Sequence, residues 1–216
     1  MLSARLYVVS GEAAPELQAE ILCRAIDGGA EVVQLRHKTA AKGGLLSAAR
    51  RVREYAHSQG ALFIVNDHLD LAMAAEADGV HLGQDDLPID IARKLWPGAI
   101  VGCSTHSHQQ ALAAQASGAD YLGVGPVYST PTKPGRAAVG TMLLGAMSDV
   151  ELPWFAIGGI DGGNLAEVLA AGASRVAVVR AVCDAPDPAG AARDLRRRIS
   201  LHESAHSAML TGGRAR

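Results

Sequence analysis

One segment of the chain is rich in glycine, proline and groups that bind anions: GPVYSTPTKPGR, residues 125–136, which follows an apolar run. The prolines on either side of Lys133 fix φ at about −65°, so the loop is stiff without regular secondary structure. Thr130 and Thr132 supply hydroxyl groups, Lys133 supplies a compact cation, and the glycines let a ligand approach the backbone. The segment therefore predicts a loop that holds an anion.

Two further cations follow another apolar run, in the motif QLRHK at residues 34–38. Arg36 and Lys38 have the same parity on an extended chain, so both side chains can point toward one ligand. Together with Lys133 they place three cations at the ends of predicted strands. A solvated surface charge is the alternative for each cation taken singly. We expect the set to bind a polyanion.

Asp67 and Asp86 are carboxylates that follow two successive predicted strands. They are suited to Mg²⁺, which proteins bind through one or two carboxylates together with phosphate oxygens of a substrate. Zinc would need a set of Cys or His ligands, which is not expected here. A salt-bridge network without a metal is the alternative. The spacing leaves open whether Asp85 or Asp86 faces the ion.

The last two predicted strands run into the turns Gly158-Gly159 and Val179-Arg180. In barrel enzymes, loops at this position often bind a phosphate group through backbone N–H groups. We therefore expect a monophosphate here, separate from the more highly charged ligand beside Arg36.

Three histidines near the same strand ends, His37, His81 and His106, are expected to have structural roles, because no carboxylate partner for them is visible in the sequence. Ser104 ends another predicted strand. It has neither a nucleophile-elbow motif nor an obvious base, so a hydrogen bond to a ligand is expected of it.

Eight short apolar runs alternate with longer segments of helical periodicity. Strands are expected at 6–9, 31–36, 62–66, 79–82, 100–104, 121–125, 154–159 and 175–179. Helices are expected at 15–28, 41–60, 69–75, 89–96, 107–117, 141–148, 165–171 and 188–199. This alternation predicts an α/β protein with a (β/α)8 TIM barrel. An open doubly wound sheet is the alternative, although no GxGxxG motif follows the first strand.

Four short, similar segments support repeated units. They are G-A-E (29–31), E-A-D-G (76–79), S-G-A-D (117–120) and A-G-A-S (171–174), and each lies where a predicted helix ends and the next strand begins. We expect one barrel domain over residues 1–200. From about Leu201 the sequence is small, polar and unpatterned, so residues 201–216 are expected to be a mobile tail.

The net charge of −2 provides no overall attraction to nucleic acid or to an anionic membrane surface. Neither a signal peptide nor a membrane span is recognisable. The three cysteines are widely spaced and predict buried thiols in a reducing compartment. We therefore expect a cytoplasmic protein that acts on small molecules, without nucleic-acid or membrane partners. A homo-oligomer is compatible with the sequence but cannot be read from it.

Six separated motifs occur in one order: QLRHK, IVNDHLDLA, GVHLGQDDLP, GCSTHS, GADYLGVGPVYSTPTKPGR and AIGGI. With them, residues 5–198 resemble the thiamine phosphate synthase family. The resemblance implies a transferase that joins 4-amino-2-methyl-5-hydroxymethylpyrimidine diphosphate to 4-methyl-5-hydroxyethylthiazole phosphate. The products would be thiamine phosphate and diphosphate. One substrate is a diphosphate and the other a monophosphate, in agreement with the two anion sites expected from the residues.

The resemblance also implies roles for individual residues. The pyrimidine diphosphate would be bound by Gln34, Arg36, Lys38, Asn66 and Lys133. Asp67 and Asp86 would hold Mg²⁺ on the diphosphate. Ser104 would meet the pyrimidine and, with Lys133, act in catalysis. The thiazole phosphate would be bound by Thr130, Thr132, Gly159, Val179 and Arg180.

In this family diphosphate is thought to leave first, giving a pyrimidine-stabilised cation that the thiazole nitrogen captures. Two residues depart from the family pattern: Arg180 stands where serine is common, and His37 where an acidic residue is common. The related thiazole tautomerase, an isomerase, is the nearest alternative. Its catalytic histidine would be expected where Pro126 stands. A non-catalytic ligand-binding barrel is the other alternative.

Overall fold

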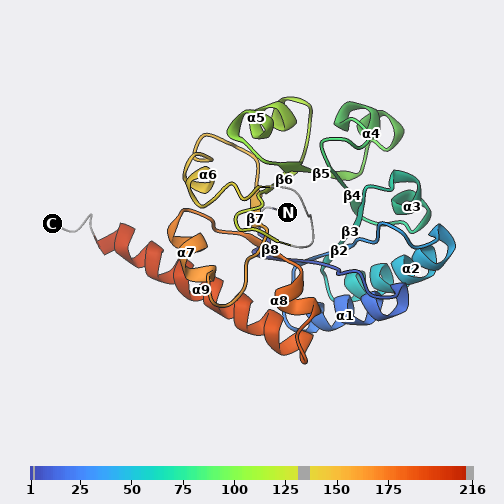
Figure 1. Cartoon of the computed structure of the whole chain (residues 1–216), viewed down its shortest axis with the longest axis horizontal. Coiled ribbons are helices and arrows are strands. Elements are labelled where there is room, and N and C mark those ends of the chain that lie inside the picture. The colour runs from blue at the N-terminus through green and yellow to red at the C-terminus, as the bar shows by residue number, and fades with distance from the viewer. Residues whose placement is uncertain (2, 131–136, 213–216) are drawn as a thin grey trace.

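Eight parallel strands form a closed barrel in which the strands pair in chain order and β8 pairs with β1. The computed structural model describes residues 1, 3–130 and 137–212, with side chains through residue 205. Figure 1 shows the helices arranged around the outside of the strands. The (β/α)8 barrel is thus confirmed, and the open doubly wound sheet is wrong. The strands are β1 (Leu6–Val9), β2 (Val32–Leu35), β3 (Leu62–Asn66), β4 (Gly79–Leu82), β5 (Ile100–Thr105), β6 (Tyr121–Val124), β7 (Trp154–Ile157) and β8 (Val176–Val178).

A helix follows each strand, close to the predicted bounds, and one short helix is additional. That helix is α8, which is too short for apolar periodicity to reveal it in the sequence. The helices are α1 (Pro15–Asp27), α2 (Lys42–Ser58), α3 (Leu69–Ala74), α4 (Ile89–Leu95), α5 (His108–Ala116), α6 (Met142–Gly145), α7 (Leu165–Ala170), α8 (Arg180–Cys183) and α9 (Pro188–Gly212).

Alternate residues of a strand face two different environments, because side chains along a strand point to opposite faces in turn. Leu6 and Val8 of β1 pack in the layer between strands and helices, whereas Tyr7 and Val9 belong to a cluster inside the barrel. The same alternation turns Gln34 of β2 inward, where it lines a pocket. Polar side chains at inward positions are therefore presented to the centre of the barrel.

The interior of the barrel is filled by aromatic rings. Phe155 lies edge-on to Tyr7 and to Tyr121, with ring centroids 5.3 and 6.0 Å apart. A glycine makes room for one of these rings: a Cβ on Gly102 would lie 2.1 Å from Cζ of Tyr121. The aromatic cluster is the floor on which the pocket described below rests.

Helix α9 is longer than predicted. The sequence predicts its end near residue 199 and an unpatterned segment from Leu201, but the helix continues through Gly212. No proline interrupts it, and Glu203 pairs with Arg5 near the start of β1. The predicted secondary structure of this segment was therefore wrong, and its mobility stays a prediction.

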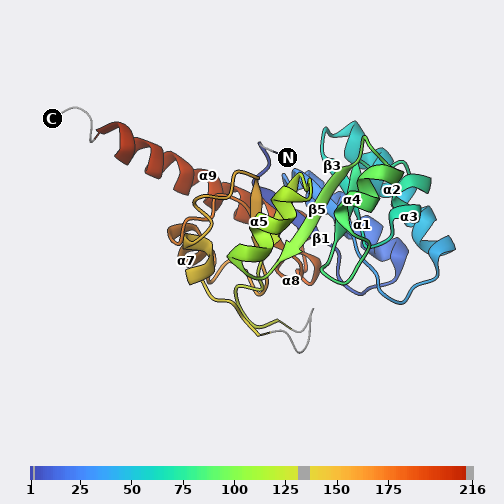
Figure 2. The same ribbon diagram turned by 90° about the horizontal axis from the view of Figure 1, so that it is seen from above.

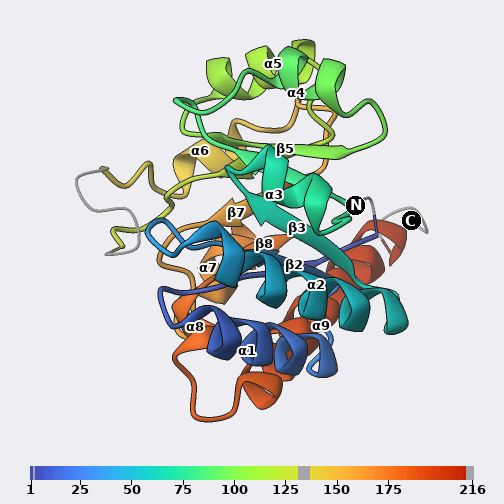
Figure 3. The ribbon, with the colours of Figure 1, turned by 90° about the vertical axis from the view of Figure 1, so that its right-hand side faces the viewer.

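The position of α9 is visible in three views. It packs against α1, which in turn packs against α2 (Figure 3). Its last turns extend beyond the other helices (Figures 1 and 2). Even this helix is not suited to a bilayer: in the described part of the chain, none combines the length and the apolar character that spanning requires.

Candidate active site

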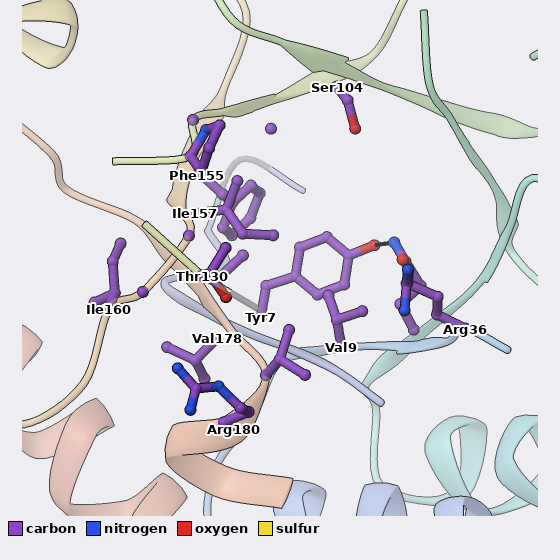
Figure 4. Close-up of a pocket in the computed structure, with 18 of the residues that line it drawn as sticks. Tyr7, Val9, Arg36, Ser104, Thr130, Phe155, Ile157, Ile160, Val178 and Arg180 are labelled. Atoms are coloured by element: carbon purple, nitrogen blue, oxygen red, sulfur yellow. Dashed lines mark hydrogen bonds between the residues drawn. The ribbon is translucent and has the colours of Figure 1, made fainter. Parts of the chain in front are cut away.

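A pocket of about 330 Å³ opens at the C-terminal ends of the strands, where barrel enzymes carry their active sites. Its lining includes most of the described residues that the sequence predicts for the site. Figure 4 shows Arg36 on one side of this pocket and Arg180 on the other, with Tyr7 between them. The predicted residues that line it are Gln34, Arg36, Asn66, Ser104, Thr130, Gly159, Val179 and Arg180.

Arg36 is held firmly at the edge of the pocket. Its side chain is only 5% exposed, and its guanidinium pairs with Glu12, which lies between β1 and α1. The backbone of Arg36 is fixed as well: its N–H donates to Oγ of Ser10 at 2.8 Å, and that hydroxyl donates to the Arg36 carbonyl at 3.0 Å. The guanidinium is thus preorganised beside the pocket, and its partner Glu12 is an exposed carboxylate.

Lys38 lies elsewhere. It is exposed and does not line the pocket, because the chain leaves the extended conformation after Leu35. Nδ1 of His37 accepts the backbone N–H of Ala40 at 2.9 Å and so closes a turn. The parity argument that aligned Lys38 with Arg36 therefore fails at this turn. The ammonium group of Lys38 makes no ion pair with any residue that the structure describes.

Five polar side chains form a hydrogen-bonded row across the floor of the pocket. Nε2 of Gln34 donates to Oη of Tyr7, whose hydroxyl lies 2.9 Å from that of Tyr121. The Tyr121 hydroxyl lies 3.0 Å from Nδ1 of His81, and Nε2 of His81 lies 2.9 Å from Oγ of Ser104. Burial raises the pKa of both tyrosines, so both hydroxyls keep their protons.

The sequence did not reveal this row. The sequence showed no obvious base for Ser104, and the structure brings the ring of His81 within hydrogen-bond distance of its hydroxyl. The two residues are 23 positions apart and meet because β4 pairs with β5 in a register that aligns His81 with Gly102. The inward parity of Tyr7 and Tyr121 within their strands is the signal that could have placed their hydroxyls in the barrel.

The opposite wall of the pocket comes from the ends of β6, β7 and β8. Gly159 has a φ of +67°, and a Cβ there would lie 2.8 Å from Cβ of Tyr128, so this position requires glycine. Its carbonyl accepts a hydrogen bond from Nδ2 of Asn164 at 2.8 Å. The guanidinium of Arg180 is exposed and has no partner among the described residues. Two further carboxylates that the sequence did not single out, Asp161 and Asp184, also line the pocket.

The central part of the predicted anion loop is outside the described residues. Thr132 and Lys133 fall there, so their predicted roles stay predictions. Thr130, just before this part, lines the pocket. The start of the loop is anchored to neighbouring strands: Val127 donates its N–H to the carbonyl of Ile157 at 2.9 Å.

Asp67 and Asp86 follow the paired strands β3 and β4 but do not line the pocket itself. Asp67 has a φ of +60°, which is uncommon for a residue other than glycine. Oδ2 of Asp86 accepts the N–H of Gly83 at 2.6 Å. Within the described residues, no three His, Cys, Asp or Glu side chains gather as a metal cluster would. Two carboxylates on neighbouring strands suit a metal that also binds substrate oxygens, and they do not form a complete protein cage.

A family model described as thiamine monophosphate synthase matches residues 6–182 of the chain. The chain belongs to the thiamine monophosphate synthase family. The match spans the barrel from β1 to α8, so it includes both walls of the pocket and its floor.

Relatives within the thiamine monophosphate synthase family agree in name. A thiamine-phosphate synthase of Gloeobacter violaceus is 53% identical over 87% of this chain and 55% of its own length. The thiamine-phosphate synthase of Thermus thermophilus is 53% identical over 82% of this chain and 86% of its own length. The chain thus spans little more than half of the Gloeobacter relative and most of the Thermus one.

Solved structures give the same family and the same fold. A thiamine phosphate pyrophosphorylase from Pyrococcus furiosus superposes with a TM-score of 0.85 and 36% identity, covering 92% of this chain and 96% of that one. A 3-hexulose-6-phosphate synthase superposes with a TM-score of 0.64 at 21% identity, covering 89% of this chain and 98% of that one, and shows the fold alone.

Proposed function

We propose that this chain is a thiamine phosphate synthase, a transferase of thiamine diphosphate biosynthesis. It joins the pyrimidine diphosphate to the thiazole phosphate, or to its carboxylate tautomer, and releases diphosphate. One observation carries the proposal: a pocket in a chain of this family is lined by Arg36 and Asn66 as well as Arg180, with Arg36 on one side and Arg180 on the other (Figure 4). Such a pocket suits two anionic substrates held face to face.

The polar groups of the pocket match a reaction driven by departure of diphosphate. This step needs charge stabilisation on the leaving group and alignment of the thiazole nitrogen more than it needs a general base. Arg36 and Asn66 would bind the diphosphate, with Lys38 and Lys133 approaching from their loops. Gln34 and Ser104 would orient the pyrimidine over the aromatic floor.

Asp67 and Asp86 would hold Mg²⁺ in the proposed enzyme. When bound, the ion neutralises charge on the diphosphate and so makes it a better leaving group. The support is their place after two paired strands, on the same side of the barrel as Arg36.

The thiazole phosphate would bind on the wall formed by Thr130, Gly159, Val179 and Arg180, with Thr132 adjoining it. Backbone N–H groups of glycine-rich loops bind phosphate well, and a guanidinium adds a charge-assisted hydrogen bond. We also propose that the enzyme works in the cytoplasm on these small molecules. Its three cysteines are free thiols, which supports that compartment.

The thiazole tautomerase is the second candidate, and the pocket does not favour it. Pro126 lines the pocket where that isomerase would need its histidine. The nearby His106 is engaged, since its Nδ1 contacts the carbonyl of Gly125. A ligand-binding barrel without catalysis would leave the paired carboxylates after β3 and β4 without a purpose.

The decisive assay follows diphosphate release from the pyrimidine diphosphate with Mg²⁺, with and without the thiazole phosphate, and detects thiamine phosphate by mass. We expect stoichiometric product that depends on both substrates and on the metal. Isomerisation of a thiazole carboxylate phosphate without coupling would move the chain to the tautomerase. Binding of both substrates without any product would identify a ligand-binding barrel.

A further inference from the structure

The Ser104–His81 pair resembles the start of a nucleophile and base dyad, because Oγ and Nε2 are 2.9 Å apart. In such a dyad the histidine accepts the hydroxyl proton at one ring nitrogen, while a carboxylate accepts the N–H of the other. Here the second nitrogen, Nδ1, faces the hydroxyl of Tyr121 at 3.0 Å. A phenol hydroxyl can donate as well as accept, so the direction of the hydrogen bonds decides what His81 does.

The far end of the row sets this direction. Gln34 donates through Nε2 to Oη of Tyr7, so the single proton of Tyr7 is available for its neighbour. Tyr7 then donates to Tyr121 across 2.9 Å, and Tyr121 donates to Nδ1 of His81. Successive donors that point the same way polarise and strengthen one another. Both phenols remain protonated because burial raises their pKa values.

A neutral imidazole has one N–H donor and one bare nitrogen acceptor. With Nδ1 occupied as the acceptor, Nε2 carries the proton and donates to Oγ of Ser104. We propose that His81 is a positioning residue held as the Nε2–H tautomer by the Tyr7–Tyr121 pair, so that Ser104 accepts from His81 and is not deprotonated by it. Ser104 then directs its own proton away from His81, as a donor on the side that lines the pocket.

The row of side chains lies against glycine residues of two strands, β5 and β6. A Cβ on Gly102 would collide with the ring of Tyr121, and a Cβ on Gly123 would lie 3.4 Å from Cε1 of His81. The side chain of His81 is 8% exposed, and Tyr7 and Tyr121 are 2% and 0% exposed. Glycine at position 102 thus admits a ring that a larger residue would displace, and a Cβ at position 123 would be in contact with the ring of His81.

The row also predicts which hydrogen-bond donors and acceptors face the substrate, and this prediction rests on the proposed function. Ser104 on β5 presents a donor, while the carbonyl oxygen of the Gln34 amide on β2 is an acceptor on the other side of the pocket. An aminopyrimidine has a ring nitrogen acceptor and an amino donor on opposite sides of its ring. The floor thus matches one orientation of that ring.

The first test measures the tautomer directly, by ¹⁵N–¹H correlation of the histidine rings in the ligand-free full chain, with His81 assigned through His81→Gln. We expect a protonated Nε2 and a bare Nδ1. A protonated Nδ1 with a bare Nε2, or protons on both nitrogens, would overturn the proposal. This measurement needs no substrate, so a failed synthase assay would leave it intact.

Variants then separate positioning from packing. Tyr121→Phe keeps the ring but removes the donor to Nδ1, so we expect a tautomer mixture at His81 and a kcat about tenfold lower, with KM changed far less. Tyr7→Phe removes the donor that orients the Tyr121 hydroxyl one step earlier, so we expect a smaller shift toward the same tautomer mixture. Tyr55→Phe, whose hydroxyl contacts Asp27 outside the barrel, is the activity control. An unchanged tautomer and kcat in Tyr121→Phe would contradict the proposed direction.

Discussion

At the N-terminal end of the barrel, charged groups bind one another and the backbone, whereas at the C-terminal mouth some polar groups face a pocket without a partner among the described residues. The N-terminal pattern repeats. Glu31, Asp78 and Asp120 precede β2, β4 and β6, and each accepts a backbone N–H from the start of the strand before, at 2.9, 2.7 and 2.7 Å. Each carboxylate thereby ties two neighbouring strands together at their starts.

The same three carboxylates also contact a basic side chain from a helix. Arg196 of α9 pairs with Glu31 at 2.8 Å, the ring of His57 in α2 lies 3.1 Å from Asp78, and Arg93 of α4 pairs with Asp120. The helices therefore join the strand ends through one repeated arrangement. Every polar group in it has a protein partner, as a structural role requires.

The mouth lacks such repetition. Asn66 and Arg180 line the pocket, and within the described residues neither side chain has a hydrogen-bond or ion-pair partner. A half-buried amide such as that of Asn66 costs free energy until a ligand satisfies it. The two ends of the barrel therefore have different roles. The polar groups at the N-terminal end stabilise the barrel, and those at the mouth are available to bind a ligand.

The largest predicted effect comes from the carboxylate that follows β3. Asp67→Asn keeps a residue that tolerates a φ of +60° but removes a charge from the proposed magnesium site. We expect kcat to fall by on the order of a hundredfold at moderate Mg²⁺, the scale for losing one preorganised electrostatic group. Thermal unfolding of the ligand-free chain should change little.

Its matched control is Asp149→Asn, which removes a carboxylate that pairs with His108 and does not line the pocket. This variant should keep full activity. If Asp67→Asn turned over like the wild type at every Mg²⁺ concentration, the carboxylate would have no metal role. Comparing Asp85→Asn with Asp86→Asn in the same assay would decide which of the two neighbours acts with Asp67.

One added methyl group can disrupt the aromatic cluster that lies under the pocket. Gly102→Ala places a Cβ about where the ring of Tyr121 lies, so the ring must move and the row to Ser104 must distort. We expect the free energy of unfolding to fall by about 1–3 kcal/mol, the usual cost of overpacking a core. Activity should fall as well. Chemical denaturation checks the first effect, and Gly98→Ala, where nothing lies within 4 Å, should show neither.

Much of this division could be read from the sequence. The alternating apolar runs predicted all eight strands, and the similar segments G-A-E, A-D-G and G-A-D marked the turns before β2, β4 and β6. From the sequence, only the glycine of these segments was explained, as a turn former. The structure shows that the acidic residue of each segment binds the neighbouring strand. In the corresponding segment before β8, Ser174 has a hydroxyl group instead.

Other features depend on contacts between distant segments and could not be predicted. The approach of His81 to Ser104 depends on the pairing of β4 with β5. The pairing of Arg36 with Glu12 depends on how the chain leaves β1. Lys38 does not line the pocket, because parity holds only while the chain is extended and β2 ends at Leu35. Local periodicity predicts which residues share a strand face, but not which side chains meet across strands.

The repeated arrangement at the N-terminal end can be tested by Glu31→Gln. The amide keeps the size of the side chain but loses the charge that binds Arg196 and the N–H groups of Arg5 and Leu6. We expect the free energy of unfolding to fall by about 1–2 kcal/mol, because charge-assisted hydrogen bonds become neutral ones. Both kcat and KM should remain at their wild-type values, which urea denaturation and steady-state kinetics would check.

Glu20→Gln, on the exposed side of α1, is the control for the loss of one negative charge. It should leave stability within a few tenths of a kcal/mol, as exposed substitutions usually do. A Glu31→Gln chain with normal stability but impaired catalysis would contradict the separation of the two ends.

The smallest predicted effect belongs to Arg180, which stands at the mouth where the family often has serine. Its guanidinium is exposed, so its contribution to binding a phosphate is screened by solvent. Arg180→Ser should raise KM for the thiazole phosphate about fivefold, which corresponds to about 1 kcal/mol, with kcat and KM for the pyrimidine diphosphate unchanged. Arg193→Ser, exposed on α9, controls for the loss of charge. An unchanged thiazole KM would assign that phosphate to the backbone of the surrounding loops, and a raised pyrimidine KM would place Arg180 on the wrong side of the pocket.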